Sequence, residues 1–373
     1  MSYQKPLIVK ANTIQSLPAA DTVNHGDFPD WDTDSPAWEQ TRQAFCMRAG
    51  AALTQTNQRA GTFGSLSGTN KWHGGVLAPN GMIYGIPYDS TTVLKINPTN
   101  DTTSTFGSLS GSDKWHGGVL APNGMIYGIP YNSTTVLKIN PTNDTASTFG
   151  SLSDQWHGGV LAPNGMIYGI PMGSTTVLKI DPTDDSVSTF GSLGAGNKWC
   201  GGVLAPNGMI YGITFDTTTV LKINPTNDTV STFGSLSAGG NKWYGGVLAP
   251  NGMIYGIPYG SETVLKIDPT DDSVSTFGSL IGGNKWWGGV LAPNGMIYGI
   301  PYGSTTVLKI NPTNDTASTF GSLSGSVKWR GGVLALNGMI YGIPYTSTAV
   351  LRLLGDFDDV QLDYCLSRHF NKF

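Results

Sequence analysis

Charged residues are scarce in this chain. Asp, Glu, Lys and Arg make up 12% of its 373 residues, against about 25% in ordinary soluble proteins. The 21 basic and 25 acidic residues give a net charge of -4, and no stretch is rich in Lys or Arg. Proteins that follow a phosphate backbone need such a stretch, so we expect no nucleic-acid partner.

Long apolar runs and cysteine are scarce as well. No run approaches the roughly 18 apolar residues needed to cross a bilayer, and the first residues lack the apolar core of a secretory signal. We therefore expect a soluble protein made in a cytosol, without membrane insertion. The cysteines, Cys46, Cys200 and Cys365, are odd in number and far apart, which predicts free thiols rather than a disulfide framework or a zinc site.

What is abundant is glycine, with 51 residues, and internal repetition. The string KWHGGVLAPNGMIYGIP recurs, lightly altered, until it has appeared seven times. Its tryptophans are spaced by 43, 41, 43, 44, 43 and 43 residues, at Trp72, Trp115, Trp156, Trp199, Trp243, Trp286 and Trp329. A period of about 40 to 45 residues is typical of one four-stranded propeller blade.

Each repeat predicts four strands and no helix. In the first copy the strands fall at 72–78, 82–88, 92–96 and 103–109, separated by the turn sequences Pro-Asn-Gly and Asn-Pro-Thr-Asn-Asp. The segment 61–66 matches the fourth strand but precedes the first Trp, whereas the seventh repeat stops after its third strand. We therefore predict an all-β fold, a seven-bladed β-propeller at 61–354 in which the N-terminal strand closes the last blade.

The seven copies differ mainly at a few positions. One is the residue after each Trp, another is the residue that follows the second strand, and the connection before each Trp varies in length and content. Alternating strand directions place all three on one face of the ring, here called the variable face. Because loops on a rigid scaffold often carry recognition, we expect ligand contacts from His73, Tyr88, His116, Tyr131, His157, Cys200, Phe215, Tyr244, Tyr259, Trp287, Tyr302, Arg330 and Tyr345.

Aromatic rings flanked by Asp, Asn, Ser and Thr suit the apolar faces and hydroxyls of sugars, so a glycan is the expected ligand. Unselected drift at tolerant positions is the alternative explanation of the same variation. The invariant Trp residues are instead expected to pack one blade on the next.

Other chemistry has weaker support in the sequence. His73, His116 and His157 occupy equivalent sites in three consecutive copies and are candidate zinc or copper ligands, yet no supporting carboxylate is implied, and we predict no metal and no cofactor. The acidic loops 181–185 and 268–272 resemble calcium ligands but are interpreted as Asx turns. Glu262, the only Glu in 61–354, has no obvious partner, so we predict that the protein is not an enzyme.

The two ends have a different composition. Residues 1–60 contain an acidic stretch and a predicted helix from Pro36 to about Ala49, with Ser35 as its cap. Closure of the ring brings both ends to the same blade. We therefore expect 1–60 to be an attachment or oligomerisation segment, with 355–373 as a C-terminal tail that packs on it.

The ends also carry a resemblance. Residues 5–9 (KPLIV) and 14–23 (IQSLPAADTV) resemble the openings of tailed-bacteriophage tail- and head-fibre proteins, and the ending LSRHFNKF resembles that of phage-associated proteins with such repeats. The repeats themselves resemble bacterial propeller families. The resemblance implies a non-enzymatic virion protein, assembled in the bacterial cytoplasm, whose ends attach to other virion proteins and which forms a homo-oligomer, with a trimer favoured.

We therefore expect a phage adhesin that binds a host-surface glycan or protein receptor through the variable face. The alternative is a structural decoration or connector protein whose ring binds another virion protein. A lyase or hydrolase built on the propeller is the third hypothesis.

Overall fold

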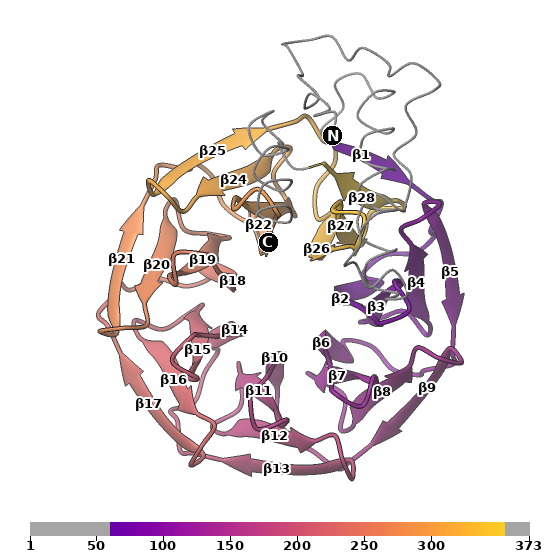
Figure 1. Cartoon of the computed structure of the whole chain (residues 1–373), viewed down its shortest axis with the longest axis horizontal. Coiled ribbons are helices and arrows are strands. Elements are labelled where there is room, and N and C mark those ends of the chain that lie inside the picture. Colours follow the sequence, from indigo (N-terminus) through magenta and orange to yellow (C-terminus); the bar gives the residue numbers. More distant parts are fainter. Residues whose placement is uncertain (1–59, 355–373) are drawn as a thin grey trace, which may run out of the picture. The chain divides into compact units, whose positions relative to one another are not determined.

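The computed structural model describes residues 60–354, and this part of the chain is all β. Seven four-stranded antiparallel sheets follow one another along the chain and stand around a common axis as the blades of a propeller (Figure 1). The predicted fold class is confirmed. None of the described segments is a helix that could span a bilayer. The predicted attachment segment, the helix at 36–49 and the C-terminal tail lie outside the described residues.

The strands occupy four equivalent places in the blades. The innermost strands are β2 (Trp72–Leu77), β6 (Trp115–Leu120), β10 (Trp156–Leu161), β14 (Trp199–Leu204), β18 (Trp243–Leu248), β22 (Trp286–Leu291) and β26 (Trp329–Leu334). The second strands are β3 (Ile83–Pro87), β7 (Ile126–Pro130), β11 (Ile167–Pro171), β15 (Ile210–Thr214), β19 (Ile254–Pro258), β23 (Ile297–Pro301) and β27 (Ile340–Pro344). The third strands are β4 (Val93–Asn97), β8 (Val136–Asn140), β12 (Val177–Asp181), β16 (Val220–Asn224), β20 (Val264–Asp268), β24 (Val307–Asn311) and β28 (Val350–Leu353). The outermost strands are β5 (Thr102–Phe106), β9 (Thr145–Phe149), β13 (Ser186–Phe190), β17 (Thr229–Phe233), β21 (Ser273–Phe277), β25 (Thr316–Phe320) and β1 (Ala60–Phe63).

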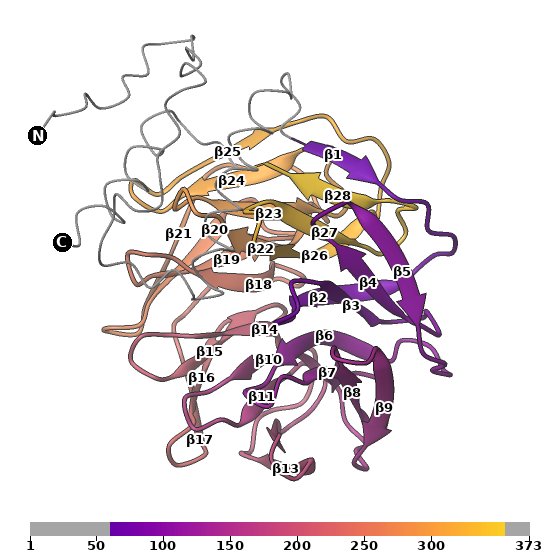
Figure 2. The ribbon, with the colours of Figure 1, turned by 45° about the vertical axis from the view of Figure 1, so that its right-hand side comes forward.

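The ring is closed by a strand from the N-terminal end of the propeller, which completes the last blade. Strand β1 pairs antiparallel with β28, with Ala60 opposite Leu353 and Phe63 opposite Val350. The seventh blade therefore has the order β1-β28-β27-β26 and draws on both ends of the described chain (Figure 2). This pairing covers the edge of β28 that would otherwise be free, as the repeat pattern predicts.

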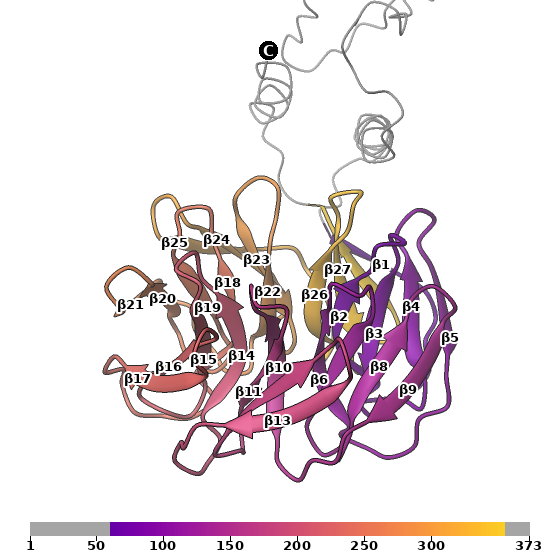
Figure 3. The same cartoon turned by 60° about the horizontal axis from the view of Figure 1, so that its bottom comes forward.

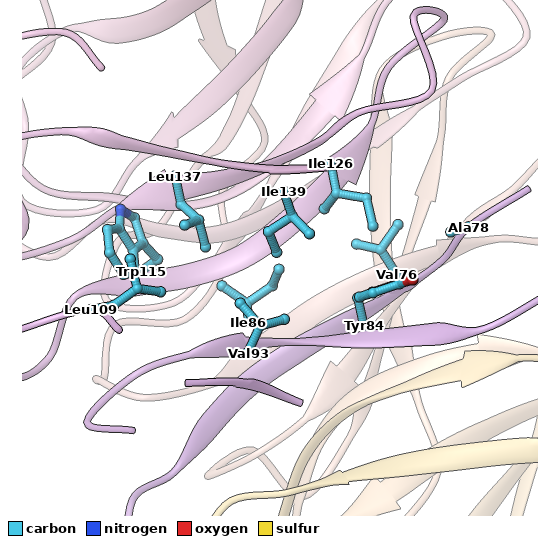
Figure 4. Close-up of a cluster of buried hydrophobic side chains, with 10 residues drawn as sticks. All are labelled: Val76, Ala78, Tyr84, Ile86, Val93, Leu109, Trp115, Ile126, Leu137 and Ile139. Carbon is cyan, nitrogen blue, oxygen red and sulfur yellow. The ribbon is translucent and has the colours of Figure 1, made fainter. Parts of the chain in front are cut away.

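The core lies between the blades. Trp115 of the second blade is 2% exposed and packs with Ile86 and Val93 of the first blade and with Leu109 from the connection between them (Figure 4). Its indole Nε1 donates to the carbonyl oxygen of Thr135 at 2.8 Å, so the one polar atom of the ring is also satisfied. Because equivalent clusters occur at the other junctions, the tryptophans act as the predicted blade-to-blade packing residues.

A polar clasp joins neighbouring blades on the face opposite the variable one. The Tyr84 hydroxyl donates to Asp144 Oδ1 at 2.9 Å, and Lys95 Nζ lies 2.6 Å from Asp144 Oδ2 in the next blade. At the last junction Arg352 takes the place of the lysine and pairs with Asp101 of the first blade. The acidic loops are the predicted Asx turns, since Thr183 N–H donates to Asp181 Oδ1 at 2.9 Å.

The connections after each second strand and before each innermost strand lie together on the variable face. Tyr88 N–H donates to the Lys71 carbonyl at 2.9 Å within the first blade, and Lys114 N–H of the second blade donates to the Tyr88 carbonyl at 3.1 Å. Backbone hydrogen bonds thus tie these loops to one another from blade to blade. Figure 3 shows the blades from the side, with loops at two opposite faces.

Candidate functional site: the axial cluster

A β-bulge at the start of each innermost strand turns the residue after Trp toward its neighbours around the axis. In the first blade Trp72 pairs with Pro87 and Gly75 with Gly85, so that His73 and Gly74 together oppose Ile86 alone. Gly74 has a φ of 75°, which glycine adopts without strain. As a result Trp72 and His73 are both 3% exposed although they are neighbours on one strand.

The same glycines form a closed ring around the axis. A Cβ built on Gly74 would lie 3.1 Å from the Cα of Gly117, and the same relation continues blade by blade until Gly331, whose Cβ would lie 3.1 Å from the Cα of Gly74. The second glycine of each pair is also enclosed, because a Cβ on Gly75 would lie 2.6 Å from Ile343 Cδ1 of the preceding blade. Packing at the axis therefore accounts for the invariant Gly-Gly that follows the variable residue.

Above this frame the variable residues of all seven blades meet, in what we call the axial cluster. Its members are His73, His116, His157, Cys200, Tyr244, Trp287 and Arg330 after the tryptophans, and Tyr88, Tyr131, Met172, Phe215, Tyr259, Tyr302 and Tyr345 after the second strands. All of them are buried except Tyr88, Tyr131 and Tyr259, which are partly exposed.

The three histidines lie at one side of the axial cluster and contact each other. The rings of His73 and His116 stack with centroids 4.3 Å apart, and His157 lies edge-on to them at 5.0 and 4.7 Å. Burial is the main cause that lowers the pKa of all three below the usual value, to about 3 for His157. The imidazoles are therefore neutral at pH 7, with free lone pairs.

A buried guanidinium occupies another part of the axial cluster. The Arg330 Cζ lies 3.6 Å from the ring centroid of Tyr345 and 4.0 Å from that of Trp287, and its Nη2 donates to the Tyr302 hydroxyl at 3.3 Å. No carboxylate among residues 60–354 forms an ion pair with it. Aromatic faces thus supply its main electrostatic partners.

The remaining members of the axial cluster are neutral. Cys200 is a free, fully buried thiol, and burial raises its pKa well above the usual range. Burial also raises the pKa of Tyr259 to about 12, and that of Tyr131 and Tyr88 above the usual value. Their phenols consequently remain protonated hydrogen-bond donors at neutral pH.

Polar loops surround the axial cluster. Asp113 N–H donates to Asp89 Oδ1 at 2.7 Å, and Ser174 Oγ donates to Asp154 Oδ2 at 3.0 Å. Ile281, in the loop before Trp286, is 86% exposed. The variable face therefore combines a central aromatic floor with acidic and amide groups and one exposed aliphatic side chain.

The structure brings together every residue that the sequence analysis assigned to ligand contact, but it buries ten of the thirteen. Of this set only Tyr88, Tyr131 and Tyr259 remain partly exposed. The contacts among these residues cannot be predicted from the sequence, because the bulge that turns them inward is a backbone feature. Met172, which shares the position of Tyr88, and Val327, at a φ of 56°, also pack on the axial cluster.

Two grooves lie on the opposite face of the ring. One groove of about 590 Å³ is lined by Lys266, Ser273 and Asp315, among others. A similar groove of about 390 Å³ on the third blade is lined by Lys179, Asp181 and Ser186. Since these grooves are built from the repeated clasp residues, they lack the variation that marks the axial cluster.

Comparisons with known proteins agree with this architecture. The family model of DUF6923, a repeat of unknown function, matches residues 159–331. No curated protein matches the chain in sequence. Among solved structures, streptogramin B lyase is similar at a TM-score of 0.68 and 10% identity, over 79% of this chain and 97% of that chain.

Two further structures have the same propeller. A catalytically inactive histidine-to-alanine variant of virginiamycin B lyase from Staphylococcus aureus, with quinupristin, is similar at a TM-score of 0.69 and 11% identity, over 80% of this chain and 99% of that chain. Hydrazine synthase of Kuenenia stuttgartiensis gives a TM-score of 0.62 at 12% identity, over 79% of this chain and 98% of that chain. At these identities the likeness shows the fold.

These comparisons contradict the prediction that the protein is not an enzyme. Streptogramin B lyase is an enzyme with the same propeller fold. The prediction assumed that near-identical blades leave no asymmetric constellation for chemistry. The axial cluster shows why the assumption was wrong, because the seven similar blades place five different kinds of side chain after their tryptophans: three imidazoles, a thiol, a phenol, an indole and a guanidinium.

Proposed function

We propose that this protein is a recognition protein of a tailed-bacteriophage virion, and that it binds a host-surface glycan on the variable face, over the axial cluster. One observation carries the proposal. Copies that are otherwise nearly identical differ where their side chains meet around a single axis. A scaffold of seven equal blades thereby acquires one asymmetric surface, and asymmetry is what selective recognition requires.

The chemistry of the variable face suits a sugar. Tyr88, Tyr131 and Tyr259 offer partly exposed ring surface against which the apolar face of a pyranose packs. Their protonated phenols and the neighbouring Asp89 and Asn132 offer donors and acceptors for hydroxyl groups. Because the rings beneath them are buried and in contact, the tyrosines are held by their neighbours and lose little freedom on binding.

The virion part of the proposal rests on the two ends of the chain. Their likeness to phage fibre proteins supports attachment of the ends to other virion proteins, with the propeller as the receptor-binding part. Assembly as a trimer would place three variable faces on one particle attachment point and strengthen weak single-site binding.

The test compares variants that the chain itself suggests. Met172 stands in the third blade where Tyr88, Tyr131 and Tyr259 stand in theirs, so a triple replacement of these tyrosines by Met keeps an apolar side chain of similar size. Leu336→Pro is the matched control on the opposite face, because it restores the Ala-Pro-Asn-Gly turn of the other six copies.

The fluorescently labelled full chain is titrated onto bacterial cells and onto their extracted surface polysaccharides. The proposal predicts saturable binding to some strains, weakened at least tenfold by the triple Met variant and unchanged by Leu336→Pro. Equal binding by all three proteins would refute the role of the variable face. Binding to a virion component instead of cells would favour a decoration or connector protein.

Cleavage of the glycan at the axial cluster is a second candidate function, favoured by one observation. Three imidazoles from consecutive blades converge in the axial cluster and make no hydrogen bond to another described residue, so each keeps a nitrogen lone pair that can accept a proton. The lyases with the same fold make this candidate testable. We expect incubation with the bound polysaccharide to shorten it if the candidate is right, and His157→Asn to abolish the shortening. An unchanged polysaccharide length would dismiss it.

A further inference from the structure

The three histidines of the axial cluster have an unusual environment. His73, His116 and His157 come from consecutive blades and are 3%, 4% and 5% exposed. One ring nitrogen from each can be chosen so that all three lie within 4.8 Å of one another. Such convergence of imidazole nitrogens at a buried point is typical of a metal site.

The hydrogen bonding of these rings provides a second, independent observation. Nδ1 and Nε2 of all three imidazoles are buried, and none of these six nitrogens has a hydrogen-bond partner in another described residue. Buried polar groups are almost always satisfied, since each unpaired one costs about 1–3 kcal/mol. The tryptophans next to them follow this rule, as the Trp72 Nε1 donation to the Thr92 carbonyl at 2.8 Å illustrates.

We propose that His73, His116 and His157 together bind one transition-metal ion of the kind that prefers imidazole ligands, zinc or copper. Tetrahedral coordination with bonds of about 2.0–2.1 Å needs donor atoms about 3.4 Å apart. The present separation of up to 4.8 Å closes through side-chain rotation that unstacks His73 from His116.

The surroundings select among ions. No carboxylate belongs to the axial cluster, so magnesium and calcium, which prefer oxygen ligands, find no suitable site there. Arg330 lies in the same cluster, and its positive charge repels a bound metal cation. Copper(I), which carries a single charge, is therefore expected to bind more tightly than zinc(II).

The experiment measures metal binding by the reduced full chain, with zinc(II) and copper(I) added separately in competition with a chromophoric chelator for each ion. We expect one ion per chain. The variant His116→Asn should weaken binding at least a hundredfold. The matched control is His25→Asn combined with His369→Asn, which removes the histidines outside 60–354 and should leave the affinity unchanged.

Two further measurements separate the proposal from a folding defect. The imidazole ¹⁵N resonances of the wild-type chain should shift on addition of one equivalent of metal, and those of His73, His116 and His157 should shift together. Arg330→Met should raise the zinc(II) affinity several-fold, in the direction opposite to the histidine variant. The proposal would be overturned if neither ion bound. It would also be overturned if a folded His116→Asn variant still bound the metal while the control variant without His25 and His369 did not. The outcome is independent of glycan binding.

Discussion

As the pH is lowered, this propeller should begin to lose stability at a higher pH than its few charged residues suggest. The cause is the burial of His73, His116 and His157 as neutral imidazoles. An unfolded chain binds a proton at each of them near pH 6.5, whereas the folded chain does not bind one until a much lower pH, about 3 for His157. The unfolded state therefore holds more protons between these values, and stability falls as the pH falls.

The size of the effect follows from the linkage relation. Each pH unit below 6.5 lowers the free energy of unfolding by about 1.36 kcal/mol per histidine. At pH 5, which is 1.5 units lower, each histidine therefore destabilises the fold by about 2 kcal/mol relative to pH 7.5. Three histidines give about 6 kcal/mol, comparable with the whole stability of many domains. Above pH 6.5 the effect vanishes, so the loss is confined to the window that begins there and extends toward pH 3.

Urea unfolding of the metal-free protein, followed by tryptophan fluorescence at pH 7.5, 6.5, 5.5 and 5.0, measures this directly. The double variant His73→Tyr, His116→Tyr is a suitable comparison, since Tyr244 stands at the equivalent position of the fifth blade. It should lose about two thirds of the pH dependence. A wild-type free energy of unfolding that changes by less than about 1 kcal/mol over this range would refute the account of the buried imidazoles.

Two further predictions concern the frame that carries the axial cluster. Gly201 and Gly208 both have positive φ, of 76° and 80°, but a Cβ would lie 3.1 Å from the Cα of Gly245 in the first case and meet nothing within 4 Å in the second. Gly208→Ala should thus lower the free energy of unfolding by about 1–2 kcal/mol through the backbone conformation alone. Gly201→Ala should lower it by about 2 kcal/mol more, because its Cβ is also crowded. Equal losses of the two variants in urea unfolding would show that the glycine ring is not crowded. A chain that starts at residue 67 lacks β1 and should associate through the free edge of β28, whereas one that starts at residue 51 keeps β1 and should not. Size-exclusion chromatography distinguishes the two, and identical elution profiles would contradict closure by β1.

The repetition of the sequence was sufficient to predict the fold. The recurring Asn-Gly turn and a spacing of 41 to 44 residues between tryptophans set the number of blades, and an unpaired strand at 61–66 revealed how the ring closes. Trp115 was correctly predicted to pack between blades, because it never varies while its neighbour does. These features are local in sequence and recur in every copy with few changes, so each copy checks the others.

The site was predicted only as a set of residues. Alternation along a strand places Trp72 and His73 on opposite sides, and nothing in the sequence states that a bulge at Gly74 buries both. The depth of burial, the stacking of His73 on His116 and the position of Arg330 over Trp287 depend on seven blades meeting at once. A single repeat, or a single pair of repeats, does not contain that information.

A crystal structure of the full chain with a fragment of the polysaccharide that it binds would test the central claim most directly. We expect a sugar ring to stack on Tyr88, Tyr131 or Tyr259, over the axial cluster. A sugar bound instead in the groove between blades that contains Lys266 and Asp315 would contradict the account, because that groove is made of residues that the blades share.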